Sequence, residues 1–194
     1  MKIPLSACVY CGSSSRVADV YKTAAHDLGT MLANCGVTVV YGGGRVGLMG
    51  VVADSALKAG GKVVGIIPEH LQNAEVGHAG LTELHIVDSM HARKRMMVDR
   101  SDGFVVLPGG LGTMDEFFEV VTWKQLHLHG KPIVLVNIDG YWDPLLKLYD
   151  HMVDSGFCRP ECRELIRVVD AVDGVMAALS SNGDTALPVE SKWL

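Results

Sequence analysis

Short apolar runs alternate with longer amphipathic stretches along most of this 194-residue chain. Runs rich in Val, Ile and Leu predict strands, and stretches with apolar positions three or four residues apart predict helices. The expected strands span residues 7–10, 37–41, 63–67, 84–87, 104–107, 133–137 and 166–169. The expected helices span residues 17–34, 48–59, 90–100, 114–127, 144–155 and 172–179.

This alternation predicts the fold class. Apolar strands separated by helices are typical of a parallel sheet covered on both faces, so we expect an α/β protein with one Rossmann-like, doubly wound sheet. The length favours a single domain, at residues 1–180, followed by a C-terminal tail at 181–194. Ligands of such sheets bind beyond the carboxyl ends of the strands, where the strand order reverses. The loops that follow strands should therefore hold the site.

The strongest candidate is the segment Pro-Gly-Gly-Leu-Gly-Thr-Met-Asp-Glu at residues 108–116, directly after an apolar run. Its glycines lack the Cβ atoms that would keep a ligand away from the backbone, and a helix start offers unpaired N–H groups to an anion. The candidate phosphate contacts are therefore Gly109, Gly110, Gly112 and Thr113.

Two carboxylates, Asp115 and Glu116, follow these glycines. The helix dipole stabilises acidic residues in a first helical turn, which is an ordinary structural reason for them to be here. Both would repel a phosphate, however. If a phosphate binds, at least one carboxylate should face a part of the ligand where positive charge sits or develops.

Two other loops should open on the same edge of the sheet. Residues 11–15 contribute Ser13, and residues 42–50 contribute Gly43 and Gly44, which makes all three candidate ribose or phosphate contacts. Close packing of a helix against a strand explains the glycines of 42–50 equally well. A dinucleotide cofactor is disfavoured, because its glycine motif should follow the first strand and be answered by an acid about 20 residues later.

Basic residues gather near an expected helix start at 90–95, where the helix dipole disfavours them. Arg93 is the one we place in the cleft, because its fork of donors suits a phosphate or a carboxylate. Adjacent helical residues point about 100° apart, so Lys94 should face elsewhere. A solvated basic face accounts for Lys94.

Composition excludes several classes of partner. Seventeen basic and 22 acidic residues give a net charge of −5 without a long basic tract, so a small anionic ligand fits better than nucleic acid. No apolar run approaches the length of a membrane span, and the start shows no signal-peptide pattern. We therefore expect a cytoplasmic protein without a membrane partner.

The five cysteines are an odd number, which argues against a disulfide framework. Cys8 and Cys11 form a C-x-x-C pair that Cys158 and Cys162 could complete as a zinc site. Residues three apart on a strand point to opposite faces, however, whereas zinc ligands converge. We therefore expect no metal and interpret these cysteines as small buried side chains.

Three motifs in this order resemble the Lonely Guy family of cytokinin riboside 5′-monophosphate phosphoribohydrolases. They are Tyr-Gly-Gly-Gly with Gly-Leu-Met-Gly at 41–50, Met-His-Ala-Arg-Lys at 90–94, and the glycine segment at 108–116. Each motif alone is weak, but the set is specific and covers most of the chain.

The resemblance implies an activity and a site. Members of this family hydrolyse the N-glycosidic bond of an N6-modified adenosine monophosphate, or of AMP itself, to free base and ribose 5-phosphate. It also implies a homodimer with neither metal nor redox cofactor, and a catalytic pair at Arg93 and Glu116. Glu75, in the stretch 68–83 that could border the site, is a further candidate substrate contact, as are Lys94 and Asp115.

The resemblance has limits and competitors. Many relatives carry an aromatic residue at the place of Leu111 and glutamate at the place of Asp115, so base preference does not transfer. One alternative function is a carrier on the same fold that binds a nucleotide or molybdenum cofactor without cleaving it. Another is lysine decarboxylase, a label often given to similar sequences. Pyridoxal chemistry needs a Schiff-base lysine, whereas Lys94 and Lys124 are interpreted as helix-face charges.

Overall fold

A computed structural model of the protein describes residues 4–72, 77–78 and 80–180. Glu75 and the expected tail at 181–194 lie outside these residues. The strands are β1 Ser6–Tyr10, β2 Thr38–Tyr41, β3 Val63–Pro68, β4 Glu83–Val87, β5 Gly103–Val106, β6 Ile133–Val136 and β7 Arg167–Val169. The helices are α1 Asp19–Asn34, α2 Gly47–Lys58, α3 Glu69–Gln72, α4 Met90–Asp99, α5 Leu111–Gln125, α6 Asp143–Asp154 and α7 Val175–Ser180, with 3-10 turns η1 Ile138–Gly140, η2 Pro160–Leu165 and η3 Val172–Gly174.

The strands form one parallel sheet in the order β4-β3-β2-β1-β5-β6-β7. β1 pairs with β5 in a register that sets Cys8 beside Phe104 and Tyr10 beside Val106. The chain moves outward from β1 to β4 and then returns to the other side of β1. The strand order therefore reverses between β1 and β5, as the prediction of a doubly wound sheet requires.

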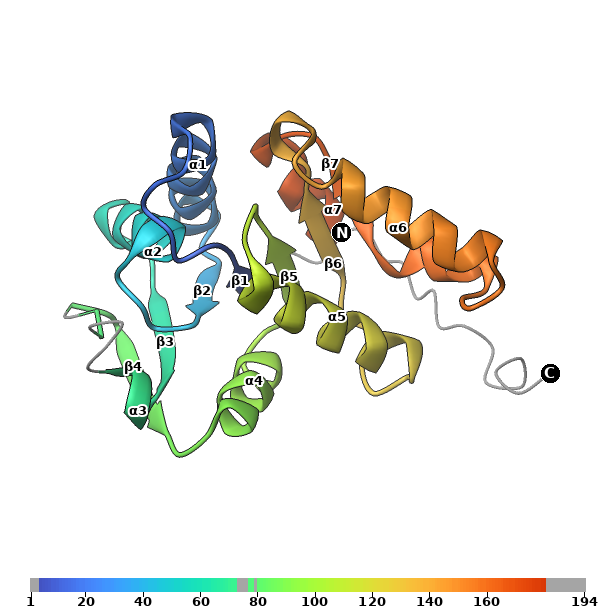
Figure 1. Cartoon of the computed structure of the whole chain (residues 1–194). Helices are drawn as coiled ribbons and strands as arrows, with labels where there is room; N and C mark the ends of the chain where they lie inside the picture. The colour runs from blue at the N-terminus through green and yellow to red at the C-terminus, as the bar shows by residue number, and fades with distance from the viewer. Residues whose placement is uncertain (1–3, 73–76, 79, 181–194) are drawn as a thin grey trace.

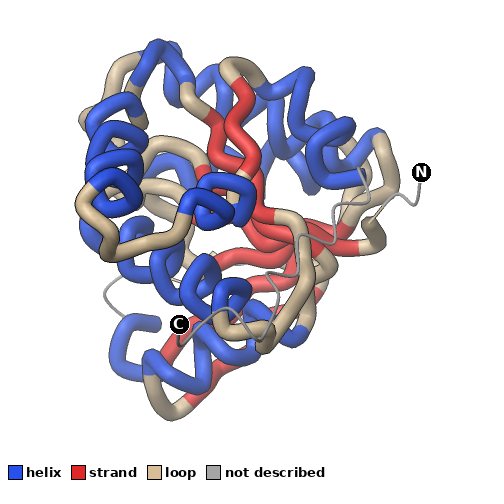
Figure 2. The backbone as a smooth tube through the Cα atoms, turned by 90° about the vertical axis from the view of Figure 1, so that its right-hand side faces the viewer, coloured by secondary structure: helices blue, strands red, loops and turns tan. Residues whose placement is uncertain are grey.

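Helices cover both faces of the sheet (Figures 1 and 2). One core packs α1, α2 and α7 against residues such as Val9, Val39 and Val105. The other packs α4, α5 and α6 against residues such as Tyr10, Phe104 and Leu135. Within the described chain, no helix is long and apolar enough to cross a membrane.

The expected and observed elements differ mainly at their ends. All seven expected strands form, and α5 begins at Leu111, three residues earlier than Met114, where the prediction began it. Glycines lower helix propensity, which hid this first turn from the sequence pattern. The expected helix at 172–179 divides into η3 and α7.

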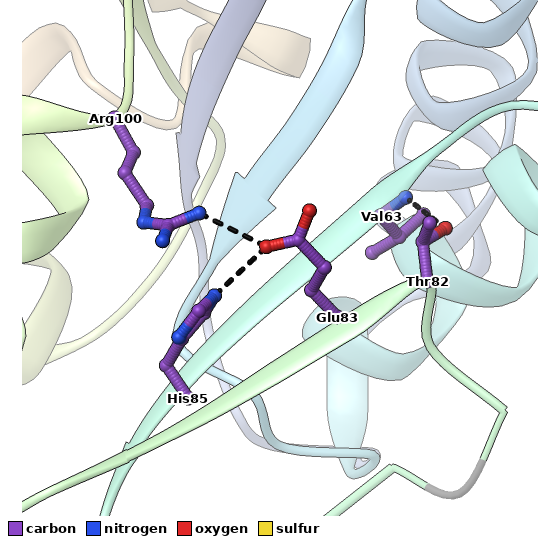
Figure 3. A network of polar contacts seen from close by, with 5 residues as sticks. All are labelled: Val63, Thr82, Glu83, His85 and Arg100. Carbon is purple, nitrogen blue, oxygen red and sulfur yellow. Dashed lines mark hydrogen bonds and ion pairs between the residues drawn. The ribbon is translucent and has the colours of Figure 1, made fainter.

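The edge strand β4 is exposed on both faces and is held by polar contacts (Figure 3). One oxygen of Glu83 accepts hydrogen bonds from His85, at 2.9 Å, and from Arg100 at the end of α4, at 3.0 Å. The adjoining Thr82 accepts a hydrogen bond from the Val63 N–H at 3.0 Å. Charged side chains on an edge strand also discourage pairing with another chain.

Candidate functional site

The loops after β1 and β5 meet at the point where the strand order reverses. The Gly12 N–H donates a hydrogen bond to the Pro108 carbonyl at 3.1 Å. A Cβ on Gly109 would overlap Thr113 Oγ1 and lie 2.9 Å from the Gly12 nitrogen. The close approach of these two loops therefore requires glycine at 109.

Helix α5 begins directly after this contact. Gly110 is its N-cap residue, and no side chain among the described residues caps it. The N–H groups of a first helical turn have no partner within the helix, so this start has donors available for an anion. A Cβ on Gly110 or Gly112 would meet no described atom within 4 Å, which leaves the space above the turn open.

A cavity of about 190 Å³ lies at this helix start. Its walls are Cys11, Gly12 and Ser13 from the loop after β1, Met49 from α2, Met90 and Arg93 from α4, and residues 110–113, 115 and 116 at the start of α5. The structure thus brings together Ser13, Arg93, Thr113, Asp115 and Glu116, which three separate segments supply. It does so because these segments all follow the carboxyl ends of strands.

Arg93 lies on one wall of the cavity and is only 6% exposed. Ser89 caps α4 by accepting a hydrogen bond from the Ala92 N–H. Helix α4 therefore begins one turn before Arg93. The guanidinium donates to the Gly42 carbonyl at 3.2 Å and to the Met90 sulfur at 3.7 Å. Its Nε has no hydrogen-bond partner among the described residues. A buried cation with an unused donor suits an anionic ligand.

The acidic wall comes from α5. Glu116 is half-buried, whereas Asp115 is exposed. Burial and the nearby charge of Glu116 raise the pKa of the Cys11 thiol well above its usual range. Cys11 therefore stays a neutral thiol at neutral pH and contributes an unreactive surface to the cavity.

Lys94 is not the solvated helix-face charge that the sequence suggested. It is 9% exposed, and its ammonium contacts Asp115 at 3.1 Å and Glu119 at 3.0 Å. Lys94 is not among the residues of the cavity wall. Lys124 is also buried and donates a hydrogen bond to the Leu165 carbonyl at 3.0 Å, so its interpretation as a surface charge is wrong as well.

The 42–50 loop is tightly packed. A Cβ on Gly47 would overlap the backbone of Ser13, and one on Gly50 would overlap the Arg45 carbonyl. Gly43 and Gly44 are buried beside the 77–78 segment, where the backbone N–H of His78 donates to the Gly43 carbonyl at 3.3 Å. These contacts favour the packing interpretation. Neither Gly43 nor Gly44 lines the cavity, and their ligand contact stays a prediction, as does that of Glu75.

Three of the cysteines, Cys8, Cys11 and Cys162, are buried as expected, whereas Cys158 is half-buried and Cys35 is exposed. Cys8 belongs to the core on one face of the sheet and Cys11 to the core on the other, as the strand period predicted. In the part of the chain that the structure describes, no group of three or more His, Cys, Asp or Glu residues is arranged to hold a metal ion.

Fold and site together define a Rossmann-like α/β protein with a glycine-rich helix start at its topological switch point. A family model described as "Possible lysine decarboxylase" matches residues 49–179. A cytokinin riboside 5′-monophosphate phosphoribohydrolase of Rhodococcoides fascians is 45% identical, over 92% of this chain and 90% of that protein. One from Arabidopsis thaliana is 45% identical over 82% of this chain and 74% of that protein. The chain therefore belongs to the cytokinin riboside 5′-monophosphate phosphoribohydrolase family.

Solved structures confirm the architecture. The molybdenum cofactor carrier protein from Chlamydomonas reinhardtii superposes with a TM-score of 0.68, over 91% of this chain and 95% of that one. The two sequences are 22% identical, so this likeness shows a shared fold and carries no conclusion about a shared ligand.

Proposed function

We propose that this protein hydrolyses the N-glycosidic bond of cytokinin riboside 5′-monophosphates and of AMP, releasing the free base and ribose 5-phosphate. The observation that carries the proposal is one cavity with Arg93 and Glu116 in its wall beside an uncapped helix start. The names of the relatives support the same reaction.

The residues suit the chemistry of this bond. As the ribosyl C–N bond breaks, positive charge grows on the sugar carbon and negative charge on the departing base. In the proposed reaction the Glu116 carboxylate stabilises the sugar cation and orients the attacking water. Arg93 supplies positive charge to the ribose phosphate or to the departing base. Neither step uses a metal or a redox cofactor.

The helix start is the proposed seat of the 5′-phosphate. Thr113 offers a hydroxyl, and residues 111–113 offer backbone N–H groups of the first turn. A cavity of about 190 Å³ is smaller than the roughly 300–1,000 Å³ of a pocket for a whole small molecule. The described walls therefore fit the sugar and phosphate, and the base would extend past Leu111, which is 91% exposed at the rim.

Glu116→Gln tests the proposed chemistry. The change keeps the shape of the side chain and removes its charge, so turnover of AMP should fall by about 10²-fold or more. The measurement is the rate of release of free base and ribose 5-phosphate. An unchanged rate in the variant would refute the role given to Glu116.

Two controls separate this function from its alternatives. Adenosine lacks the phosphate, so its kcat/KM should be far below that of AMP if the helix start holds that group. A carrier would bind the nucleotide and release no ribose 5-phosphate.

We also propose a homodimer, on the strength of the family resemblance, and sedimentation velocity would test it.

The decarboxylase description has less support. A Schiff base needs a lysine amine that reaches the cofactor. Lys94 and Lys124 are the buried lysines of the described chain, and both ammonium groups already contact protein oxygens.

A further inference from the structure

Asp115 poses an electrostatic problem for the proposed phosphate site. It lines the cavity one turn from the helix start, and its side chain is 58% exposed. A carboxylate there would repel a phosphate bound at the first turn of α5. Glu119 stands one turn further along α5 and adds a second negative charge to the same side.

The positive charge of Lys94, which lies outside the cavity wall, offsets the negative charges of Asp115 and Glu119. Its ammonium lies 3.1 Å from one oxygen of Asp115 and 3.4 Å from the other, and 3.0 Å from Glu119. The lysine side chain is 11% exposed and that of Glu119 is 22% exposed, so solvent screens their contact weakly, whereas the more exposed Asp115 keeps part of its contact with solvent. The three side chains join α4 to α5, the two helices that carry Arg93 and Glu116.

The ammonium is fixed in its charged form. Burial by itself disfavours the charge on Lys94, but the hydrogen bonds and charges of Glu119 and Asp115 outweigh that penalty and raise its pKa. Lys94 is therefore a permanent cation at neutral pH.

We propose that Lys94 is a positioning residue that acts on the phosphate through Asp115: it cancels the carboxylate's charge at the cavity wall, while Glu119 holds the ammonium in place. This inference rests on the proposed function, in that it assumes a 5′-phosphate at the start of α5. It differs from a direct contact between Lys94 and the substrate.

Binding of ribose 5-phosphate, measured by titration calorimetry, tests the inference without catalysis. Lys94→Met leaves the charge of Asp115 uncompensated, so the affinity should fall by about tenfold or more. Asp115→Asn removes the repulsive charge and should bind at least as tightly as the parent protein. The double variant Lys94→Met/Asp115→Asn should regain most of the affinity that Lys94→Met loses. A direct contact predicts the opposite, because the double variant would then bind as weakly as Lys94→Met.

Further measurements separate this role from simple misfolding. Lys94→Arg keeps the charge and should keep most of the affinity, whereas a general packing defect would lower it too. In kinetics with AMP, Lys94→Met should raise KM more than it lowers kcat, and its kcat/KM for adenosine should change far less. Equal losses on both substrates would overturn the inference.

The inference and the proposed function can fail separately. A parent protein that binds ribose 5-phosphate but releases no base from AMP would refute the hydrolase and still allow the calorimetric test. Unchanged binding in Lys94→Met, with AMP hydrolysis intact, would refute the counter-ion role alone. A parent protein that binds no ribose 5-phosphate would overturn the inference as well.

Discussion

The carbonyl oxygen of Gly42 accepts a hydrogen bond from Arg93. The Arg93 guanidinium also occupies the space that a side chain at position 42 would need. The guanidinium donates to that oxygen at 3.2 Å, and a Cβ on Gly42 would overlap Arg93 Nη2. Gly42, the first residue after β2, therefore fixes the direction of the Arg93 guanidinium, which α4 supplies.

Gly42→Ala should move the guanidinium without removing it. A displacement of about 1 Å at a reacting group can cost on the order of 10²-fold in rate, so we expect kcat/KM for AMP to fall by roughly 10- to 100-fold. Steady-state kinetics measures the loss, and thermal unfolding of the same variant shows how much of it is structural.

A double-variant cycle shows whether the effect passes through Arg93. If it does, Gly42→Ala should change little more in an Arg93→Ala background, because residues that act as a unit are not additive. A further loss of the same size in that background would mean that Gly42 acts independently of Arg93.

At the residue scale, sequence reasoning found the charged groups and missed what holds them. The residue pattern placed Arg93 in the cleft, and the family resemblance paired it with Glu116; both residues line the cavity. The role of Gly42 went unseen because a carbonyl oxygen has no signature in the sequence. The burial of Lys94 was missed because a polar pattern assigns lysine to solvent, and only the fold reveals its two carboxylate partners.

At the scale of elements, the strand pattern was predicted well and the turns were not. Continuous apolar runs identify buried strands whatever lies between them, which is why all seven strands were expected. The 3-10 turns η1 and η2 went unpredicted, because short turns depend on local contacts rather than on periodicity. One such contact is Trp142 N–H to the Asn137 side chain, at 2.7 Å.

The connection from α5 to β6 carries a pH-dependent element, His129. Its Nε2 donates to the Val120 carbonyl at 2.9 Å, and its Nδ1 accepts from the Lys131 N–H at 3.2 Å. Because one ring nitrogen donates and the other accepts, these two hydrogen bonds require the neutral imidazole. Burial lowers the pKa of His129 below the ordinary value of 6.5, and the charges of Lys131 and Lys124 lower it further.

The stability of the protein should therefore fall in mild acid. A folded-state pKa below the unfolded value means that unfolding takes up a proton, so this stabilisation is complete above about pH 6.5 and is lost as the pH falls below it. Thermal unfolding between about pH 7.5 and about pH 5.5 should show a smaller decline for His129→Gln than for the parent protein. Equal declines would exclude His129 as a source of the acid sensitivity.

At the scale of the whole molecule, the cavity joins the two halves of the sheet. The loop after β1 belongs to the half that runs to β4, and the start of α5 follows β5 in the other half. The sequence predicted that these two loops open on the same edge of the sheet, and the structure adds that β1 and β5 are the neighbouring strands where the order reverses. The detailed shape of the cavity was not predictable, because it depends on how closely the two loops approach.

A ligand that bridges the two halves should stabilise the molecule as one cooperative unit. The Glu116→Gln variant allows AMP to bind while it is consumed about 10²-fold more slowly. At about 100 times its Kd, AMP should add about 2.7 kcal/mol to the free energy of unfolding. That gain corresponds to a rise in Tm of roughly 5–10 °C for a domain of this size. Adenosine at the same concentration should give a smaller rise, and an equal rise would argue against a phosphate seat at α5.

The contact between Gly12 and Gly109 has a consequence for protein engineering. A Cβ on Gly109 would overlap Thr113 and lie 2.9 Å from the Gly12 nitrogen, and one on Gly12 would lie 3.3 Å from the Gly109 Cα, so this contact leaves little room for a side chain. Leu111, two residues further on, projects into solvent at the rim and is free to become larger, smaller or polar. Directed evolution toward a new nucleobase should therefore hold both glycines fixed and randomise position 111 first.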